Sequence, residues 1–220
     1  MNRQWGISQE WLKIIACVTM LIDHIGAVFF PWDLEFRIIG RLAFPIYCFL
    51  LAEGLAWTRN AGRYALRLAV GVLLAEIPFD FLFFRGWTWG HQNVMITLLL
   101  GCLTVIWMEK MGNWKVFPLL ICMSLAELLH TDYGATGVLM VAMFSLTRNH
   151  QHRRWIQTLL LGLLCWYKGG LQLYAVAAMV PIALYSGKKI TRNPWIQRGF
   201  YLFYPVHLLI LAVIAGRFGG

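Results

Sequence analysis

The sequence predicts an all-α protein, a polytopic bundle of transmembrane helices in which residues 1–220 form one integral membrane domain. Three observations predict this class: 60% of the residues are hydrophobic, 13% are charged, and the apolar residues gather in runs. A membrane helix needs about 20 mostly apolar residues, which many of these runs approach. Soluble domains carry roughly a quarter charged residues and fewer apolar ones, so the composition excludes that class and also excludes a disordered chain.

Charged residues, Pro, Gly and Asn divide the chain into about nine apolar segments. The first segment carries Asp23 and His24 and has no small-residue cleavage site, which indicates a retained span rather than a removed signal peptide. The fifth to seventh segments are short for a full crossing, so tilt, bilayer thinning or a re-entrant path stays open for them. The predicted segments lie near residues 11–30, 36–57, 64–84, 93–110, 115–130, 133–147, 155–167, 171–186 and 198–216.

The basic residues predict the orientation of the chain. If the N-terminus is cytoplasmic and every segment crosses, the cytoplasmic side receives most of the 19 basic residues, as the positive-inside rule requires. The net charge of +9 is then explained by cytoplasmic loops and anionic lipid. No basic helix or aromatic-basic sheet motif suggests nucleic acid as a partner. The basic residues left on the outer side are Arg37, Arg41, Arg85, Lys168 and Arg217.

Lys13 and His24 are the pair of ionisable residues that most directly suggests chemistry. An ionisable side chain in hydrocarbon costs about 2.5–3.5 kcal/mol and therefore points to function. The helical repeat of about 100° per residue places both on one face, about 16 Å apart along the axis. This geometry suits a long anionic cosubstrate with its phosphates on Lys13 and its reactive end near His24. The alternative is a snorkelling lysine and a histidine bonded to a neighbouring helix.

Two arginines form a second candidate group. Arg37 and Arg41 are four residues apart and share a helix face. Adjacent helical residues point about 100° apart, so Asp23 is expected to contact Arg37 or Arg41 rather than His24. An arginine at membrane depth needs such a partner.

Two carboxylates, Glu76 and Asp80, flank Pro78 and are also four residues apart. They predict either a salt-bridge network with the arginines or a group that orients His24 or Arg41 for general-base catalysis. Further polar residues begin or lie within later segments: Gln92, Asn93, Tyr133 and His207. Such residues are usually helix caps, interfacial anchors or packed core groups, but their common depth makes them candidates. The five cysteines are predicted to be small buried apolar residues, and no His, Cys, Asp or Glu residues have the spacing of metal ligands.

The chain resembles the TraX family of integral membrane proteins. The resemblance spans about Leu12 to Leu211, in order, in the strings KIIACVTMLIDHIGAVFFP, RIIGRLAFPIYCFLLAEG, AEIPFDFLF, QNVMITLLLG, DYGATGVL and FYLFYPVHLLIL. The family's namesake is associated with N-terminal acetylation of conjugative pilin subunits. The resemblance therefore implies a multi-pass protein of the bacterial plasma (inner) membrane.

TraX proteins are in turn similar to membrane acyltransferases that acetylate cell-surface sugars. That group carries an Arg or Lys, ten residues and then a His in its first helix, which Lys13 and His24 match. The paired arginines of that group have counterparts in Arg37 and Arg41 with different spacing, and a late Tyr-to-His pattern resembles residues 201–207. The resemblance implies transfer of an acyl group from cytosolic acetyl-CoA to an acceptor outside.

The sequence thus predicts an enzyme, a membrane-bound acetyltransferase whose acceptor is a pilin-like subunit or a glycan. Its rivals are a noncatalytic pilus-assembly factor and a proton- or cation-coupled transporter. The predicted catalytic residues are His24, Asp23, Glu76 and Asp80. Substrate or acetyl-CoA binding is predicted for Lys13, Arg37, Arg41, Gln92, Asn93, Tyr133 and His207.

Overall fold

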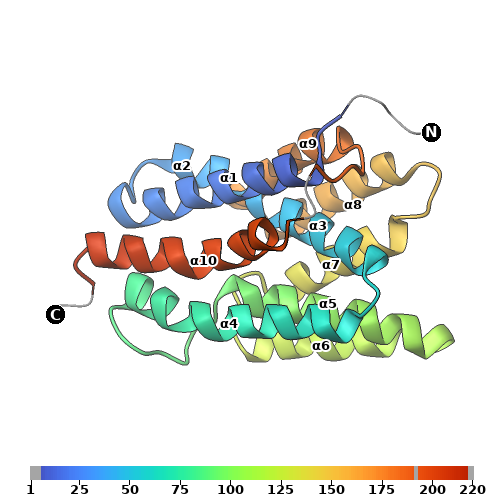
Figure 1. The fold of residues 1–220 in the computed structure, drawn as a ribbon, viewed down its shortest axis with the longest axis horizontal. Coiled ribbons are helices and arrows are strands. Elements are labelled where there is room, and N and C mark those ends of the chain that lie inside the picture. The colour runs from blue at the N-terminus through green and yellow to red at the C-terminus, as the bar shows by residue number, and fades with distance from the viewer. Residues whose placement is uncertain (1–5, 191–192, 218–220) are drawn as a thin grey trace.

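The computed structural model describes residues 6–190 and 193–217, which form helices and connecting loops (Figure 1). Strands are absent from these ranges, where isolated bridges join Ile7 to Tyr185 and Gln92 to Thr131. The all-α prediction is confirmed. The helices are α1 (Gln9–Phe29), α2 (Leu34–Gly40), α3 (Ala43–Trp57), α4 (Ala61–Phe84), α5 (Val94–Met111), η1 (Gly112–Trp114), α6 (Val116–Leu128), α7 (Gly134–Thr147), α8 (Arg153–Lys168), η2 (Gly170–Ala178), α9 (Met179–Ala183) and α10 (Pro194–Ile214).

Each apolar segment predicted from the sequence carries helix, with ends that differ by a few residues. Two segments are less regular than predicted. The segment 36–57 divides into α2 and α3 between Gly40, a weak helix former, and Pro45, which lacks an N–H group. The segment 171–186 begins as the 3₁₀ helix η2, and Pro181 lies within the short α9 that follows. Hydropathy reports burial of a segment but does not distinguish these helix types.

The C-terminal helix α10 lies between α1 and α4 (Figure 1) and packs against both. The helices α4, α5 and α6 form one side of the bundle, and α7 packs against α3, α5 and α6. The first residues of α1 and the last residues of α10 lie at opposite ends of the bundle (Figure 1). Because α10 enters between two N-terminal helices, it brings side chains from the end of the chain beside α1.

Apolar side chains cover much of the outer surface. Leu66, Leu73 and Ile77, spaced along α4, are each at least half exposed. A soluble protein rarely exposes apolar patches of this extent, whereas a helix in contact with lipid does. Four segments are long and apolar enough to cross a membrane: Gln9–Phe29, Leu34–Trp57, Val94–Trp114 and Trp195–Ile214.

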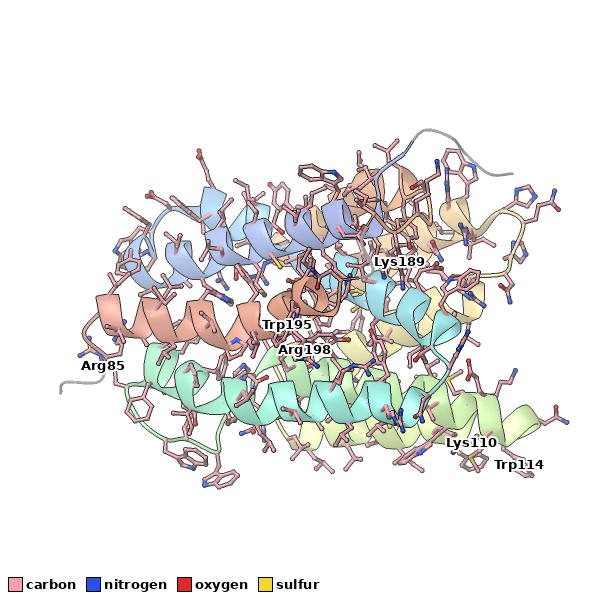
Figure 2. The ribbon with its side chains drawn as sticks, in the orientation of Figure 1. Arg85, Lys110, Trp114, Lys189, Trp195 and Arg198 are labelled. Atoms are coloured by element: carbon pink, nitrogen blue, oxygen red, sulfur yellow. The ribbon has the colours of Figure 1, made fainter. Side chains whose placement is uncertain are left out.

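Some of the cationic and tryptophan side chains lie at the two ends of the bundle, whereas Lys189, Trp195 and Arg198 lie between the ends (Figure 2). Figure 2 shows Lys110 and Trp114 at one end and Arg85 at the other. Trp114 is 64% exposed, and Trp87 and Trp89 project from the loop that follows Arg85. Amphipathic indole rings favour the headgroup level of a bilayer, so their positions suit a protein whose long axis crosses the membrane.

Small residues allow close approach where helices cross. A Cβ atom added to Gly101 of α5 lies 2.7 Å from a methyl carbon of Val141 on α7. Gly162 of α8 is also helical, but nothing lies within 4 Å of its added Cβ. Helix packing in membranes uses such small residues because lipid tails provide no hydrophobic drive for association.

We expect Gly101→Ala to lower the free energy of unfolding by about 1–3 kcal/mol, because the new methyl group overpacks the α5–α7 contact. Gly162→Ala serves as the matched control and is expected to be neutral or stabilising by up to about 1 kcal/mol, since alanine favours helix. Denaturant unfolding in detergent micelles measures both changes. Equal effects of the two substitutions would contradict the close α5–α7 approach.

Candidate functional site

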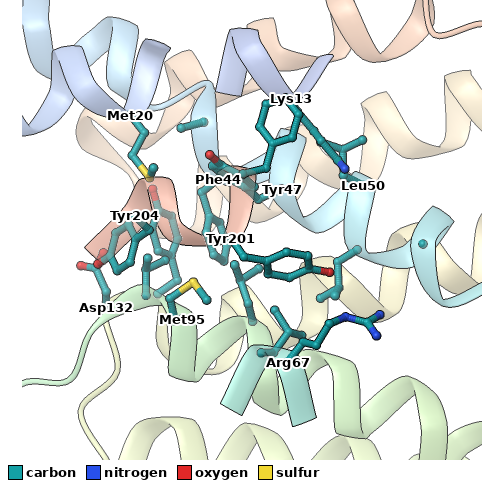
Figure 3. Close-up of a pocket in the computed structure, with 18 of the residues that line it drawn as sticks. Lys13, Met20, Phe44, Tyr47, Leu50, Arg67, Met95, Asp132, Tyr201 and Tyr204 are labelled. Atoms are coloured by element: carbon teal, nitrogen blue, oxygen red, sulfur yellow. The ribbon is translucent and has the colours of Figure 1, made fainter. Parts of the chain in front are cut away.

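One cavity of about 1550 Å³ runs through the bundle between α1, α3, α4, α5 and α10. Lys13, near the start of α1, and His24, near its end, both line this cavity. The lining also includes Tyr47 of α3, whose hydroxyl is 3.2 Å from the Sγ atom of Cys17, and Tyr201 of α10, both of which Figure 3 shows together with Lys13. The helix face that Lys13 and His24 share is therefore one wall of a continuous space.

The end of the cavity beside Lys13 is cationic. Five basic side chains line it, namely Lys13, Arg59, Arg67, Lys189 and Arg198. Within residues 6–190 and 193–217, none of the five forms an ion pair with a carboxylate. The carboxylate that shares this part of the lining is Glu53, which is buried. This end therefore carries an excess of positive charge and suits a ligand with several negative charges.

Neutral partners position two of these cations. The Nζ atom of Lys13 donates to the Oε1 atom of Gln197 on α10 at 2.5 Å. The guanidinium of Arg67 lies 5.3 Å from the ring centroid of Tyr64 and 6.0 Å from that of Tyr201. Figure 3 shows Lys13 and Arg67 entering the cavity from opposite sides of Tyr201. Amide and aromatic contacts orient the charges without neutralising them.

At the other end of the cavity, one carboxylate lies between two guanidinium groups. Asp23 accepts hydrogen bonds from Arg37 at 2.7 Å and from Arg41 at 3.1 Å. The expected contact of Asp23 with an arginine is confirmed, and it involves both arginines. Arg41 also donates to the backbone carbonyl of Arg37 at 3.3 Å. These three side chains carry two positive charges and one negative charge, and the carboxylate of Asp132 lines the same part of the cavity.

His24 is paired with His207 of α10. The Nδ1 atom of His24 lies 2.7 Å from the Nε2 atom of His207, and the two ring planes differ by 9°. The Nδ1 atom of His207 lies 2.6 Å from the backbone carbonyl oxygen of Phe203. His24 lines the cavity, whereas His207 is 5% exposed and lies behind it. His207 is thus placed to hold the ring of His24, and it lies outside the cavity lining in which a binding role was predicted for it.

In the part of the chain that the structure describes, Glu76 and Asp80 form no ion pair with Arg37 or Arg41 and no hydrogen bond with His24, so neither the predicted salt-bridge network nor the predicted orientation of His24 or Arg41 is found. Glu76 accepts a hydrogen bond from the side chain of Asn93. Asp80, which is fully buried, accepts from the backbone N–H of Thr88 at 3.2 Å. Neither carboxylate lines the cavity. Because α10 occupies the space between α1 and α4, the partner of His24 comes from α10.

Gln92 and Asn93 are also structural rather than cavity-lining residues. Gln92 donates to a backbone carbonyl of its own loop, and Asn93 caps the N-terminus of α5 while it bonds Glu76. Tyr133 does line the cavity, and its ring stacks on that of Phe44 with centroids 3.6 Å apart.

The loop before α5 meets the loop before α7 at the cavity wall near Arg41 and Tyr133. The Nε2 atom of His91 lies 3.6 Å from a carboxylate oxygen of Asp132, and both residues line the cavity. Backbone bonds from Gln92 to the carbonyl of His130 and from Asp132 to that of Gln92 join the same loops. The neighbouring carboxylate of Asp132 raises the pKa of His91, against an opposing effect of burial.

Because the pKa of His91 is raised by folding, its contribution to stability is complete below about pH 6.5 and is lost as the pH rises through the folded-state pKa. We expect the melting temperature of the wild type to fall relative to that of His91→Gln between pH 6 and pH 8.5. The difference is about 1–2 °C, since a half-exposed pair contributes less than about 1 kcal/mol. Thermal unfolding in detergent at the two pH values measures it, and an opposite sign would contradict the pairing with Asp132.

The sequence analysis did not assign a site role to four of the cations at the end of the cavity beside Lys13: Arg59, Arg67, Lys189 and Arg198. These residues belong to the basic loops that predicted the orientation of the chain. The abundance of basic residues in those loops did not indicate which of them line a cavity. The described part of the chain holds no group of three or more His, Cys, Asp or Glu side chains placed to bind a metal ion.

Comparison with known proteins gives consistent matches over most of the chain. A family model described as TraX protein matches residues 8–215. The chain is 28% identical to a probable fimbrial assembly protein, FimC of serogroup H1, from Dichelobacter nodosus, over 96% of this chain and 97% of that protein. It is 27% identical to Protein TraX of Escherichia coli (strain K12), over 96% of this chain and 89% of that protein. No solved structure matches the chain.

Proposed function

The chain belongs to the TraX protein family, and we propose that it is an integral membrane acetyltransferase. In this proposal it moves an acetyl group from cytosolic acetyl-CoA to an amine or hydroxyl acceptor at the outer side of the bacterial plasma (inner) membrane. The observation that carries the proposal is the single cavity that joins an unneutralised cationic end to the imidazole of His24. Such a path allows a donor on one side of the membrane to react with an acceptor on the other.

The proposed orientation has a cytoplasmic N-terminus and nine crossings. It places the cationic end of the cavity at the cytosol, together with Arg59, Lys189 and Arg198, and it agrees with the positive-inside rule. His24, Arg37 and Arg41 then lie toward the outer side. The same orientation makes the protein multi-pass in the inner membrane.

Acetyl-CoA suits a cavity that is cationic at the end beside Lys13 and holds His24 at the other end. Its phosphates require cations, which Lys13 and the four basic side chains around it supply. Its long flexible arm can then reach along the cavity toward His24. The cavity volume of about 1550 Å³ exceeds that of pockets for drug-sized ligands, which are about 300–1,000 Å³, so space remains for an acceptor.

The proposed chemistry uses His24 as general base. The imidazole takes a proton from the acceptor amine or hydroxyl as that group attacks the thioester carbonyl of acetyl-CoA. Negative charge develops on the carbonyl oxygen of the tetrahedral intermediate, where Arg37 and Arg41 supply positive charge. When the C–S bond breaks, the proton on His24 passes to the CoA sulfur, which leaves neutral imidazole and free CoA.

A second candidate function is a noncatalytic role in pilus assembly. It is favoured by the name of one relative, a probable fimbrial assembly protein that covers nearly the whole chain. In both candidates the partner is a pilin-like subunit, but the acetyltransferase proposal also allows a glycan acceptor. The two differ in whether the partner carries an acetyl group after the encounter.

We expect the purified protein in lipid nanodiscs to bind acetyl-CoA, and the double variant Lys13→Gln/Arg67→Gln to bind it about tenfold or more weakly, because charge-assisted hydrogen bonds to phosphate are lost. Lys110→Gln removes a positive charge outside the cavity and is the matched control. Isothermal titration calorimetry measures each affinity. Equal affinity in the double variant and the control contradicts the donor site.

Transfer itself is tested with acetyl-CoA labelled in the acetyl group, a peptide with a free N-terminal amine and an oligosaccharide. Label on either acceptor supports the enzyme. Copurification of a pilin-like subunit whose N-terminus carries no acetyl group in mass spectrometry supports the assembly role. Proton or cation flux in liposomes without an acyl donor supports a transporter and contradicts the proposal.

A further inference from the structure

The hydrogen bonds around His207 determine which of its ring nitrogens carries hydrogen. The backbone carbonyl of Phe203 can only accept a hydrogen bond, and it lies 2.6 Å from the Nδ1 atom of His207. The Nδ1 atom of His207 is therefore the donor. In a neutral imidazole the other nitrogen, Nε2, then carries a lone pair and is an acceptor.

The same reasoning extends from His207 to His24. The Nε2 acceptor of His207 lies 2.7 Å from the Nδ1 atom of His24, so the Nδ1 atom of His24 must donate the hydrogen. Neutral His24 then has no hydrogen on Nε2. This is the ring nitrogen left available to the cavity, and an unprotonated nitrogen is what a general base requires.

The surroundings of His207 keep it in this arrangement. Its side chain is 5% exposed, lies outside the cavity lining and packs against the ring of Phe203 with centroids 4.8 Å apart. The nearly parallel planes of His24 and His207, 9° apart, add a second contact that holds the ring of His24. The ring of His24 also packs edge-on against Phe83, 5.7 Å between centroids.

We propose that His207 is a positioning residue that holds His24 in the tautomer with hydrogen on Nδ1 and a lone pair on Nε2. The catalytic consequence rests on the proposed acetyltransferase function, but the tautomer itself does not. Two successive hydrogen bonds fix both rings. His24 donates through Nδ1 to His207, and His207 donates through Nδ1 to the backbone carbonyl of Phe203. Helix α10 thus contributes the residue that positions His24, in a site whose other residues come mainly from the N-terminal half of the chain.

The experiment measures the tautomer directly by ¹⁵N NMR of the full-length protein, labelled at histidine nitrogens and held in lipid nanodiscs at pH 8. A spectrum of His24→Gln identifies the His24 signals by their absence. In the wild type we expect His24 to show a protonated Nδ1 and an unprotonated Nε2. A wild-type His24 with hydrogen on Nε2 overturns the inference, and this result needs no variant of His207 to fold.

Two substitutions at position 207 test whether His207 determines the tautomer of His24. Glutamine can accept from His24 through its carbonyl oxygen and donate to Phe203 through its amide, so His207→Gln is expected to keep the His24 tautomer. Leucine offers no acceptor, so His207→Leu is expected to shift His24 toward hydrogen on Nε2. An unchanged tautomer in a folded His207→Leu protein shows that another group fixes His24 and overturns the role of His207.

Activity gives an independent readout. We expect His207→Leu to lower kcat about 10- to 100-fold with little change in the KM for acetyl-CoA, and His207→Gln to stay within about tenfold of the wild type. If no transfer is found in the wild type while the tautomer is as expected, the proposed function fails and the inference about His207 stands. If transfer occurs but the tautomer is reversed, the inference fails and the proposed function stands.

Discussion

Replacement of His24 by alanine is expected to reduce acetyl transfer about 10²- to 10⁴-fold, the range that a general base contributes. The substitution removes the imidazole proposed as general base, which lines the cavity together with Arg37 and Arg41. Affinity for acetyl-CoA is expected to change little, because the cationic end beside Lys13 is intact. Labelled transfer in nanodiscs and calorimetric binding measure the two effects separately.

His152→Ala is the matched control for this experiment. His152 is exposed in the loop before α8 and does not line the cavity. We expect this variant to transfer acetyl groups at the wild-type rate. Undiminished transfer by His24→Ala, in a protein that still binds acetyl-CoA, would remove His24 from the chemistry.

The sequence predicted the parts of this site that depend on local geometry. The helical repeat placed Lys13 and His24 on one face, and both line one cavity. The offset between neighbouring residues directed Asp23 away from His24 and toward the arginines, where two hydrogen bonds lie. These predictions succeed because residues on one helix, or on helices joined by a short loop, have few ways to be arranged.

Contacts between distant parts of the chain could not be predicted in the same way. His24 and His207 are separated by 183 positions, and nothing in either segment specifies that α10 inserts between α1 and α4. Without that insertion, the sequence predicts Glu76 or Asp80 on α4 as the partner of His24. Hydropathy reports that α10 and α4 are apolar, but it carries no information about which helices become neighbours.

The basic side chains at the end of the cavity beside Lys13 could not be predicted from the sequence for a different reason. Arg59 and Lys189 lie in loops, where basic residues are expected at a cytoplasmic surface for topological reasons alone. Only the three-dimensional arrangement separates these side chains, which line the cavity, from Lys110, which does not. A rule that explains every basic residue equally well cannot identify the few that form a site.

Asp23→Asn is expected to lower the free energy of unfolding by about 3 kcal/mol. The substitution leaves Arg37 and Arg41 close together without their shared carboxylate, and an uncompensated charge that is largely removed from water costs about 3–5 kcal/mol. The lower end of this range applies because the side chain of Arg37 retains 31% exposure, against 17% for Arg41. Denaturant unfolding in detergent micelles measures the change.

The matched control for Asp23→Asn is Asp33→Asn, which makes the same chemical change at an exposed residue before α2 whose side chain forms no capping bond. We expect it to change the free energy of unfolding by less than about 0.5 kcal/mol. In an Arg41→Leu background the cost of Asp23→Asn should shrink, since one of the two uncompensated charges is already absent. Equal costs in both backgrounds would mean that Asp23 stabilises the fold by some contact other than the two arginines.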